Sequence, residues 1–180
     1  QLTSAARDYL SRERIEIRPG EQAKQDCFPL LTGGFLTEKP EHMTHLNGDF
    51  LVVKDHPRII FRGKLDTLES ELILCQLTDK GLEATVGEIL ELARRIIRCE
   101  VLDEPLQWDR LCGLTEEEQR KRSHFPQDYY GQPHFMPSAA DGAAIARLNR
   151  ARCAARHTCT VVCGLRRRMH GFWPVGAGEP

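Results

Sequence analysis

Residues 57–101 decide the fold: PRIIFRGKLDTLESELILCQLTDKGLEATVGEILELARRIIRCEV. Apolar residues recur in this stretch at steps of three to five, which is mostly helical spacing. The recurring residues are Ile60, Leu65, Leu68, Leu72, Leu77, Leu82, Val86, Ile89, Ala93, Ile96, Ile97 and Val101. Pro57 suits a first helical turn, and the break Asp79-Lys80-Gly81 divides the pattern. The stretch therefore predicts two long antiparallel helices joined by a short turn.

The segments before this pair carry weaker patterns. Residues 1–18 predict a helix followed by a short strand, because Ile15-Glu16-Ile17 alternates apolar and polar residues. Residues 20–48 are rich in glycine and proline and predict a loop or a small irregular subdomain. We therefore interpret residues 1–48 as a small helix–strand and loop region that precedes a helical-bundle domain over residues 49–152.

After the pair, Thr115 predicts the start of a short third helix, with Glu118 at the reciprocal capping position. Residues 123–138 contain three prolines and predict an ordered loop, and a further helix is expected from Ala139 to Arg150 or beyond. Apolar periodicity then fails. Residues 153–180 are therefore predicted to be an irregular tail, which indicates a frameshifted or truncated gene. The predicted fold class is all-α, an antiparallel helical bundle with the N-terminal appendage and this tail.

Composition narrows the function classes. The chain has 180 residues, and 25 basic and 26 acidic residues give a net charge of −1, which argues against a protein that covers nucleic acid with positive charge. No apolar run approaches the ~20 residues of a membrane span, and the first residues lack a secretory pattern. The seven cysteines are an odd number, which disfavours a disulfide scaffold and favours the cytoplasm.

Charge is unevenly distributed, and this keeps a second function open. Residues 142–180 hold seven arginines and one carboxylate, a balance of +6. Basic tails bind phosphate backbones, so the alternative function is a non-enzymatic helical module that binds nucleic acid or a partner through this tail.

Two polar groups could bind a phosphate-bearing ligand. Arg62, Asp66 and Glu69 share a stripe when the leucines of the first helix face the core, and could hold a phosphate and orient an arginine from another helix. Asn149-Arg150 lies among further arginines, whose planar guanidinium groups suit triphosphate oxygens. A solvated helix face and a basic helix end are the structural alternatives. No metal ligands are predicted, because no C-x-x-C pair occurs, and phosphate-loop, G-x-G-x-x-G and G-x-S-x-G motifs are absent.

A string of segments over residues 2–152 carries a resemblance to a known family. The segments are LTSAARDYL (2–10), IEI (15–17), THL (44–46), LVVKDHPRI (51–59), FRGKLD (61–66), EPL (104–106), GL (113–114), HFMP (134–137), DG (141–142) and LNR (148–150). In order and spacing they resemble the cobalamin adenosyltransferase family of ethanolamine utilization.

The resemblance implies a helical-bundle enzyme that moves the 5′-deoxyadenosyl group of ATP to the cobalt of cob(I)alamin and releases triphosphate. ATP and cobalamin would be its substrates, so the protein would need no nucleophile of its own. The resemblance also implies a homo-oligomer, a corrinoid reductase and ethanolamine-utilization proteins as partners, and a cytoplasmic or microcompartment location. It implies no role for nucleic acid or a membrane.

The resemblance also implies site residues. The wider corrinoid adenosyltransferase family carries G-x-x-D-x-L-x-S, which Gly63, Asp66, Leu68 and Ser70 match, and an R-x-x-x-R pattern whose first arginine is Arg150. In that family the aspartate and the arginine pair across a subunit interface beside ATP, so Asp66 and Arg150 are the predicted catalytic residues. The family roles extend to these two residues only. From their charge and aromatic character, the predicted binding residues are Arg62, Lys64, Glu69 and Asn149, with Phe125, Tyr129 and Phe135 against the corrinoid.

The chain departs from the family pattern at three positions. Ala154 stands in place of the second arginine, and His157 in place of a glutamate expected shortly after it. Cys27 alone remains where enteric members carry a CC-x-x-C metal motif. The requirement for a divalent metal therefore stays open.

Overall fold

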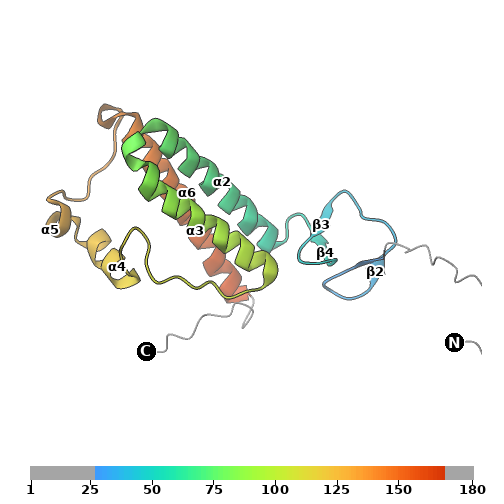
Figure 1. The fold of residues 1–180 in the computed structure, drawn as a ribbon. Coiled ribbons are helices and arrows are strands. Elements are labelled where there is room, and N and C mark those ends of the chain that lie inside the picture. Colours follow the sequence, from blue (N-terminus) through green and yellow to red (C-terminus); the bar gives the residue numbers. More distant parts are fainter. Residues whose placement is uncertain (1–26, 169–180) are drawn as a thin grey trace, which may run out of the picture.

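The computed structural model describes residues 27–168, and its largest unit is a bundle of three helices (Figure 1). These are α2 (Pro57–Thr78), α3 (Glu83–Leu102) and α6 (Gly142–Arg168). Helix α2 packs against both of the others. The helix and strand predicted over residues 1–18 lie outside the described residues.

The predicted antiparallel pair is confirmed as α2 and α3, and local interactions account for its ends. The His56 side chain caps α2 by accepting a hydrogen bond from the Arg58 amide at 3.2 Å, and Pro57 occupies the first turn. Asp79 ends α2, and its carboxylate accepts from the Gly81 amide at 2.8 Å. This bond begins the short 3₁₀ helix η1 (Lys80–Leu82), which turns the chain into α3.

The core lies where the three helices meet. Its buried residues are Phe61, Leu65, Leu68, Leu72, Cys75, Val86, Leu90, Ala93 and Ala151. Ile60 and Leu77 were expected on the same face, but they are 43% and 70% exposed. Each is five residues from its neighbour in the predicted pattern, and five helical residues rotate a side chain about 140° away from the stripe.

Helix α6 corrects the prediction of an irregular tail from residue 153, because the helix continues to Arg168. The apolar stripe continues through small side chains: Ala151 and Thr158 are buried, and Ala155 and Val162 pack against the core. Alanine favours helix and lets α6 approach α2, where Thr158 Oγ1 lies 3.5 Å from the Lys64 carbonyl oxygen. Residues 153–168 therefore keep a helical pattern of buried residues, and the argument for a frameshift does not apply to them. Residues 169–180 lie outside the described part.

Two small antiparallel sheets precede the bundle, so the chain is mostly helical but not purely α. Strand β1 (Phe28–Pro29) pairs with β2 (Phe35–Leu36), and β3 (Met43–His45) pairs with β4 (Leu51–Val53). The predicted loop thus forms short strands. The β3–β4 hairpin crosses the boundary predicted between residues 48 and 49, so strand pairing joins the two segments there.

The connection from α3 to α6 carries two short helices beside the bundle (Figure 1). Helix α4 (Glu116–His124) starts with the predicted capping box of Thr115 and Glu118. Helix α5 (Pro126–Tyr130) corrects the loop expected over residues 123–138, because Pro126 fits a first turn. A 3₁₀ turn, η2 (Ala139–Asp141), then delays the start of α6 to Gly142. None of the described helices combines the length and the apolar character that a membrane span requires.

Candidate functional site

An ion pair between α2 and α6 is central to the candidate site. Arg150 of α6 donates through Nε to Glu71 Oε1 of α2 at 2.5 Å. The Glu71 side chain is only 7% exposed, whereas that of Arg150 is 70% exposed. A carboxylate held in the helix packing thus anchors a guanidinium group that faces solvent.

The way in which Arg150 is anchored leaves its terminal nitrogens available. Only Nε contacts Glu71, and Nη1 and Nη2 donate to no residue in the described part of the chain. The second carboxylate oxygen, Glu71 Oε2, is buried and has no hydrogen-bond partner among the described residues. Because the two terminal nitrogens of an arginine form a fork that matches phosphate oxygens, this arrangement can bind an oxyanion.

A buried thiol lies beside the anchor. Burial raises the pKa of the Cys75 thiol, the Glu71 carboxylate raises it further, and Arg147 acts in the opposite direction. Cys75 therefore stays a protonated core residue. Arg147 precedes Arg150 by three residues, about one helical turn, on α6. Helix α6 thus brings two arginines to this part of α2.

Asp66 is not the partner of Arg150 within one chain. Asp66 precedes Glu71 by five residues, which in a helix corresponds to about 7.5 Å along the axis and 140° of rotation. It is exposed, and its carboxylate forms no ion pair with the described residues. Pairing between Asp66 and Arg150 in two different copies of the chain stays a prediction.

Arg62 belongs to a second, buried cluster near the start of α2. Its Nε contacts Glu100 Oε2, and its Nη2 donates to the Leu46 carbonyl at 2.6 Å. Arg58 contacts Glu100 Oε1 and the Glu100 carbonyl, and it donates to Asp103 at 2.7 Å. The cluster joins α2 to α3 and, through Arg62, to the β3–β4 hairpin.

The other predicted polar residues also have separate surroundings. Glu69 accepts from Arg94 of α3 at 3.2 Å, so the expected stripe of Arg62, Asp66 and Glu69 does not share one partner. Lys64 is exposed on α2. Asn149 Oδ1 accepts two hydrogen bonds from Arg152, at 3.1 and 2.8 Å, and so lies next to Arg150 but is oriented by another arginine.

The predicted corrinoid-facing rings are exposed on the connection between α3 and α6. Phe125 is 59%, Tyr129 49% and Phe135 59% exposed. Rings this accessible do not belong to the bundle core. Exposed aromatic groups in one segment are typical of a ligand or partner surface.

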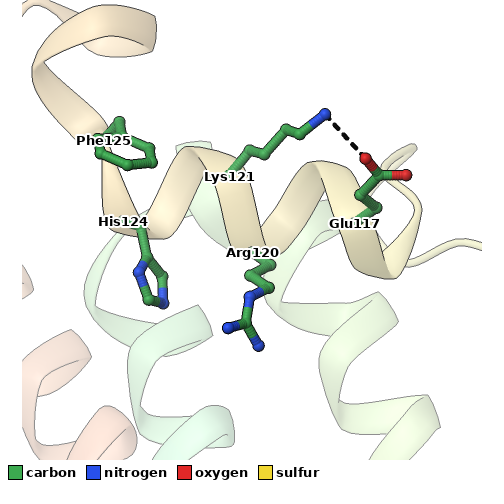
Figure 2. A pocket seen from close by; sticks show the side chains of 5 residues that line it. All are labelled: Glu117, Arg120, Lys121, His124 and Phe125. Carbon is green, nitrogen blue, oxygen red and sulfur yellow. Dashed lines mark ion pairs between the residues drawn. The ribbon is translucent and has the colours of Figure 1, made fainter.

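A hollow of about 420 Å³ lies on α4 and includes the ring of Phe125 (Figure 2). It is lined by Glu117, Arg120, Lys121, His124 and Phe125.

Sequence reasoning missed Arg120 and His124, although their spacing of four residues on a short helix places them on one side. It also missed Glu71, although Glu71 stands three residues after Leu68 and four before Cys75. An acidic residue in a core stripe is the signal that could have found it.

Metal ligands do not gather in the described part of the chain. No three histidine, cysteine, aspartate or glutamate side chains between residues 27 and 168 lie together in a way that could hold a metal ion. Cys27, which only the resemblance relates to a metal motif, is exposed.

Comparison with curated proteins finds relatives of one kind. Over 185 residues the chain is 32% identical to corrinoid adenosyltransferase EutT of Salmonella typhimurium, an alignment that covers 89% of this chain and 69% of the relative. It is 32% identical over 127 residues to corrinoid adenosyltransferase EutT of Escherichia coli K12, covering 70% of this chain and 48% of the relative. The chain thus spans about two thirds of the first protein and about half of the second. These matches confirm the resemblance seen in the sequence. No protein-family model and no solved structure matches.

Proposed function

We propose that this chain, which belongs to the EutT family of corrinoid adenosyltransferases, transfers the 5′-deoxyadenosyl group of ATP to cob(I)alamin in ethanolamine utilization. The cobalt of cob(I)alamin attacks the 5′ carbon with its electron pair, the bond between that carbon and the triphosphate oxygen breaks, and inorganic triphosphate leaves. The protein supplies no nucleophile. It binds the two substrates, orients them, and stabilises the charge on the leaving triphosphate.

The anchoring of Arg150 on Glu71 is the observation that supports this proposal most. Triphosphate is the largest charge that the reaction places in the site, and Arg150 presents two unpaired terminal nitrogens from a fixed position. Arg147 adds positive charge one turn away on the same helix. Lys64 and Asn149 remain proposed ATP-binding residues at the edges of this surface.

Two other predicted residues take modified roles. Arg62 contacts Glu100 and Leu46, so we propose that it holds the bundle end in place and does not bind triphosphate. Asp66 is proposed to act across a subunit boundary, because both it and Arg150 are exposed and a second copy of the chain could reach either.

The exposed rings of Phe125, Tyr129 and Phe135 are proposed to contact the corrinoid and to exclude water from its lower face.

The alternative function uses the basic segment to bind nucleic acid or a partner. Two arginines of that segment have partners within the chain: Arg150 contacts Glu71, and Arg152 contacts Asn149. No observation on the described residues favours this alternative over the transferase.

The test is adenosylation of cob(I)alamin by the full chain. Reduced cobalamin and ATP should yield a spectrum of an alkyl-cobalt species, and Arg150→Ala should raise the KM for ATP by roughly ten- to a hundredfold. Arg98→Ala, which removes an exposed arginine from α3, is the control and should leave that KM unchanged. No alkyl-cobalt product with the unaltered chain, or equal KM changes in both variants, would overturn the proposal.

A further inference from the structure

The hollow on α4 carries two side chains with nitrogen donors, Arg120 and His124, that the proposed reaction does not yet use. Arg120 and His124 are one helical turn apart and project to the same side of α4 (Figure 2). The ring of Phe125 follows directly, with its centroid 6.4 Å from that of His124. The hollow therefore combines nitrogen donors with an apolar ring that is 59% exposed.

The partners of the neighbouring basic residues single out these two. Lys121 pairs with Glu117 at 2.8 Å, and the Arg122 guanidinium lies over the Tyr129 ring, 5.5 Å from its centroid. The side chains of Arg120 and His124 form no hydrogen bond or ion pair with the described side chains of residues 27–163. Glu117, the acidic residue of the hollow, is already paired with Lys121. The Arg120 guanidinium and the His124 imidazole therefore line the hollow without a counter-charge.

This combination matches a singly charged phosphate ester. One guanidinium group and one imidazole can donate to both free oxygens of a phosphodiester, and Phe125 can contact the organic group attached to it. A triphosphate carries several negative charges and would leave most of them uncompensated here. The surface around Arg147 and Arg150 suits it better.

We propose that Arg120 and His124 bind the phosphodiester of the nucleotide tail of cobalamin, next to Phe125, one of the rings proposed to contact the corrin. The proposal rests on the proposed adenosyltransferase function and deepens it. It separates the two phosphate-bearing substrates: α6 takes the triphosphate of ATP, and α4 takes the phosphodiester of the corrinoid. Recognition of this group would make the chain prefer complete cobalamin to cobinamide, which lacks the nucleotide tail.

The test compares the binding of cob(II)alamin and cob(II)inamide to the full chain by absorbance titration. Arg120→Gln should weaken cob(II)alamin binding roughly tenfold and leave cob(II)inamide binding unchanged. His124→Ala should act in the same direction. Arg98→Gln removes the same charge from α3 and should change neither affinity, which separates a local contact from a general loss of positive charge. Circular dichroism confirms that each variant folds.

Each other outcome has a defined meaning. If Arg120→Gln weakens both corrinoids equally, or neither, the phosphodiester assignment is wrong while the transferase proposal stands. If ATP binding falls instead, the hollow binds the triphosphate and the assignment is again wrong. If the unaltered chain binds neither corrinoid, the proposed function fails and this inference fails with it.

Discussion

Two buried carboxylates show how single residues organise this protein. Glu71 and Glu100 both lie on core faces, at 5% and 1% exposure, and each is matched to arginine. They differ in the burial of the partner: Arg150 is largely exposed, whereas Arg58 and Arg62 are enclosed. We therefore assign Glu100 to stability and Glu71 to the positioning of an exposed cation.

The first prediction concerns Glu100. Glu100→Gln removes the buried negative charge that the two enclosed arginines share, so the free energy of unfolding should fall by about 3–5 kcal/mol. Urea denaturation measures it. Glu91→Gln, which removes a largely exposed carboxylate from the same helix, should have a much smaller effect. Comparable losses in the two variants would show that the cluster at the start of α2 does not stabilise the fold.

The second prediction is a pH dependence that comes from His56. Burial lowers the pKa of His56, and the neighbouring Arg58 lowers it further. The neutral ring accepts the hydrogen bond that caps α2 at Nδ1, and a proton on that atom would remove the acceptor. The unfolded chain takes up this proton at higher pH than the folded chain. The stabilisation is therefore complete above about pH 6.5 and is lost as the pH falls through the lowered folded value.

His56→Asn tests this, because asparagine can cap a helix but does not titrate. Unfolding measured between pH 7.5 and 5 should show a smaller loss of stability in this variant than in the unaltered chain. Parallel pH profiles would remove His56 as the source of the dependence.

At the scale of elements, α6 depends on small side chains. Ala151 is 6% exposed and lies among the core residues of α2, whereas Ala146 lies exposed on the same helix. Ala151→Leu should lower the free energy of unfolding by about 1–3 kcal/mol, because added volume at a close helix contact forces displacement. Ala146→Leu makes the same chemical change in solvent and should be nearly neutral. Equal effects in thermal denaturation would mean that α6 does not pack tightly there.

At the scale of the whole molecule, the prediction is a homo-oligomer. Asp66 and Arg150 are exposed on neighbouring helices of one chain, and the proposal pairs Asp66 with Arg150 of the partner subunit. Asp66→Asn should weaken assembly at least severalfold, because it removes the charge of an intersubunit ion pair. Sedimentation velocity over a range of concentrations measures this. Lys80→Gln, a change at a highly exposed residue of η1, is the control. A chain that stays monomeric at every concentration contradicts the prediction.

Sequence reasoning succeeded wherever the cause was local. The spacing of leucines in α2, the proline of its first turn, and the capping box of Thr115 and Glu118 all act within about one helical turn. The turn at Asp79 is local as well, since its carboxylate binds an amide two residues away. Prediction failed at α6, where alanine and threonine form the buried stripe and a count of large apolar residues overlooks them.

The pairing of charges depended on contacts between distant residues. Several acidic residues on α2 could contact an arginine of α6. Arg150 contacts Glu71, and 79 positions in the sequence separate these two residues. Which carboxylate it meets follows from how far α6 is shifted along α2 and how each helix is rotated. Core packing sets both, so Glu71 and not Asp66 faces Arg150 within one chain. Arg62 likewise meets Glu100 only because α3 returns antiparallel to α2. No short-range pattern encodes such a register, because its free energy comes from apolar surface buried along the whole length of the helices.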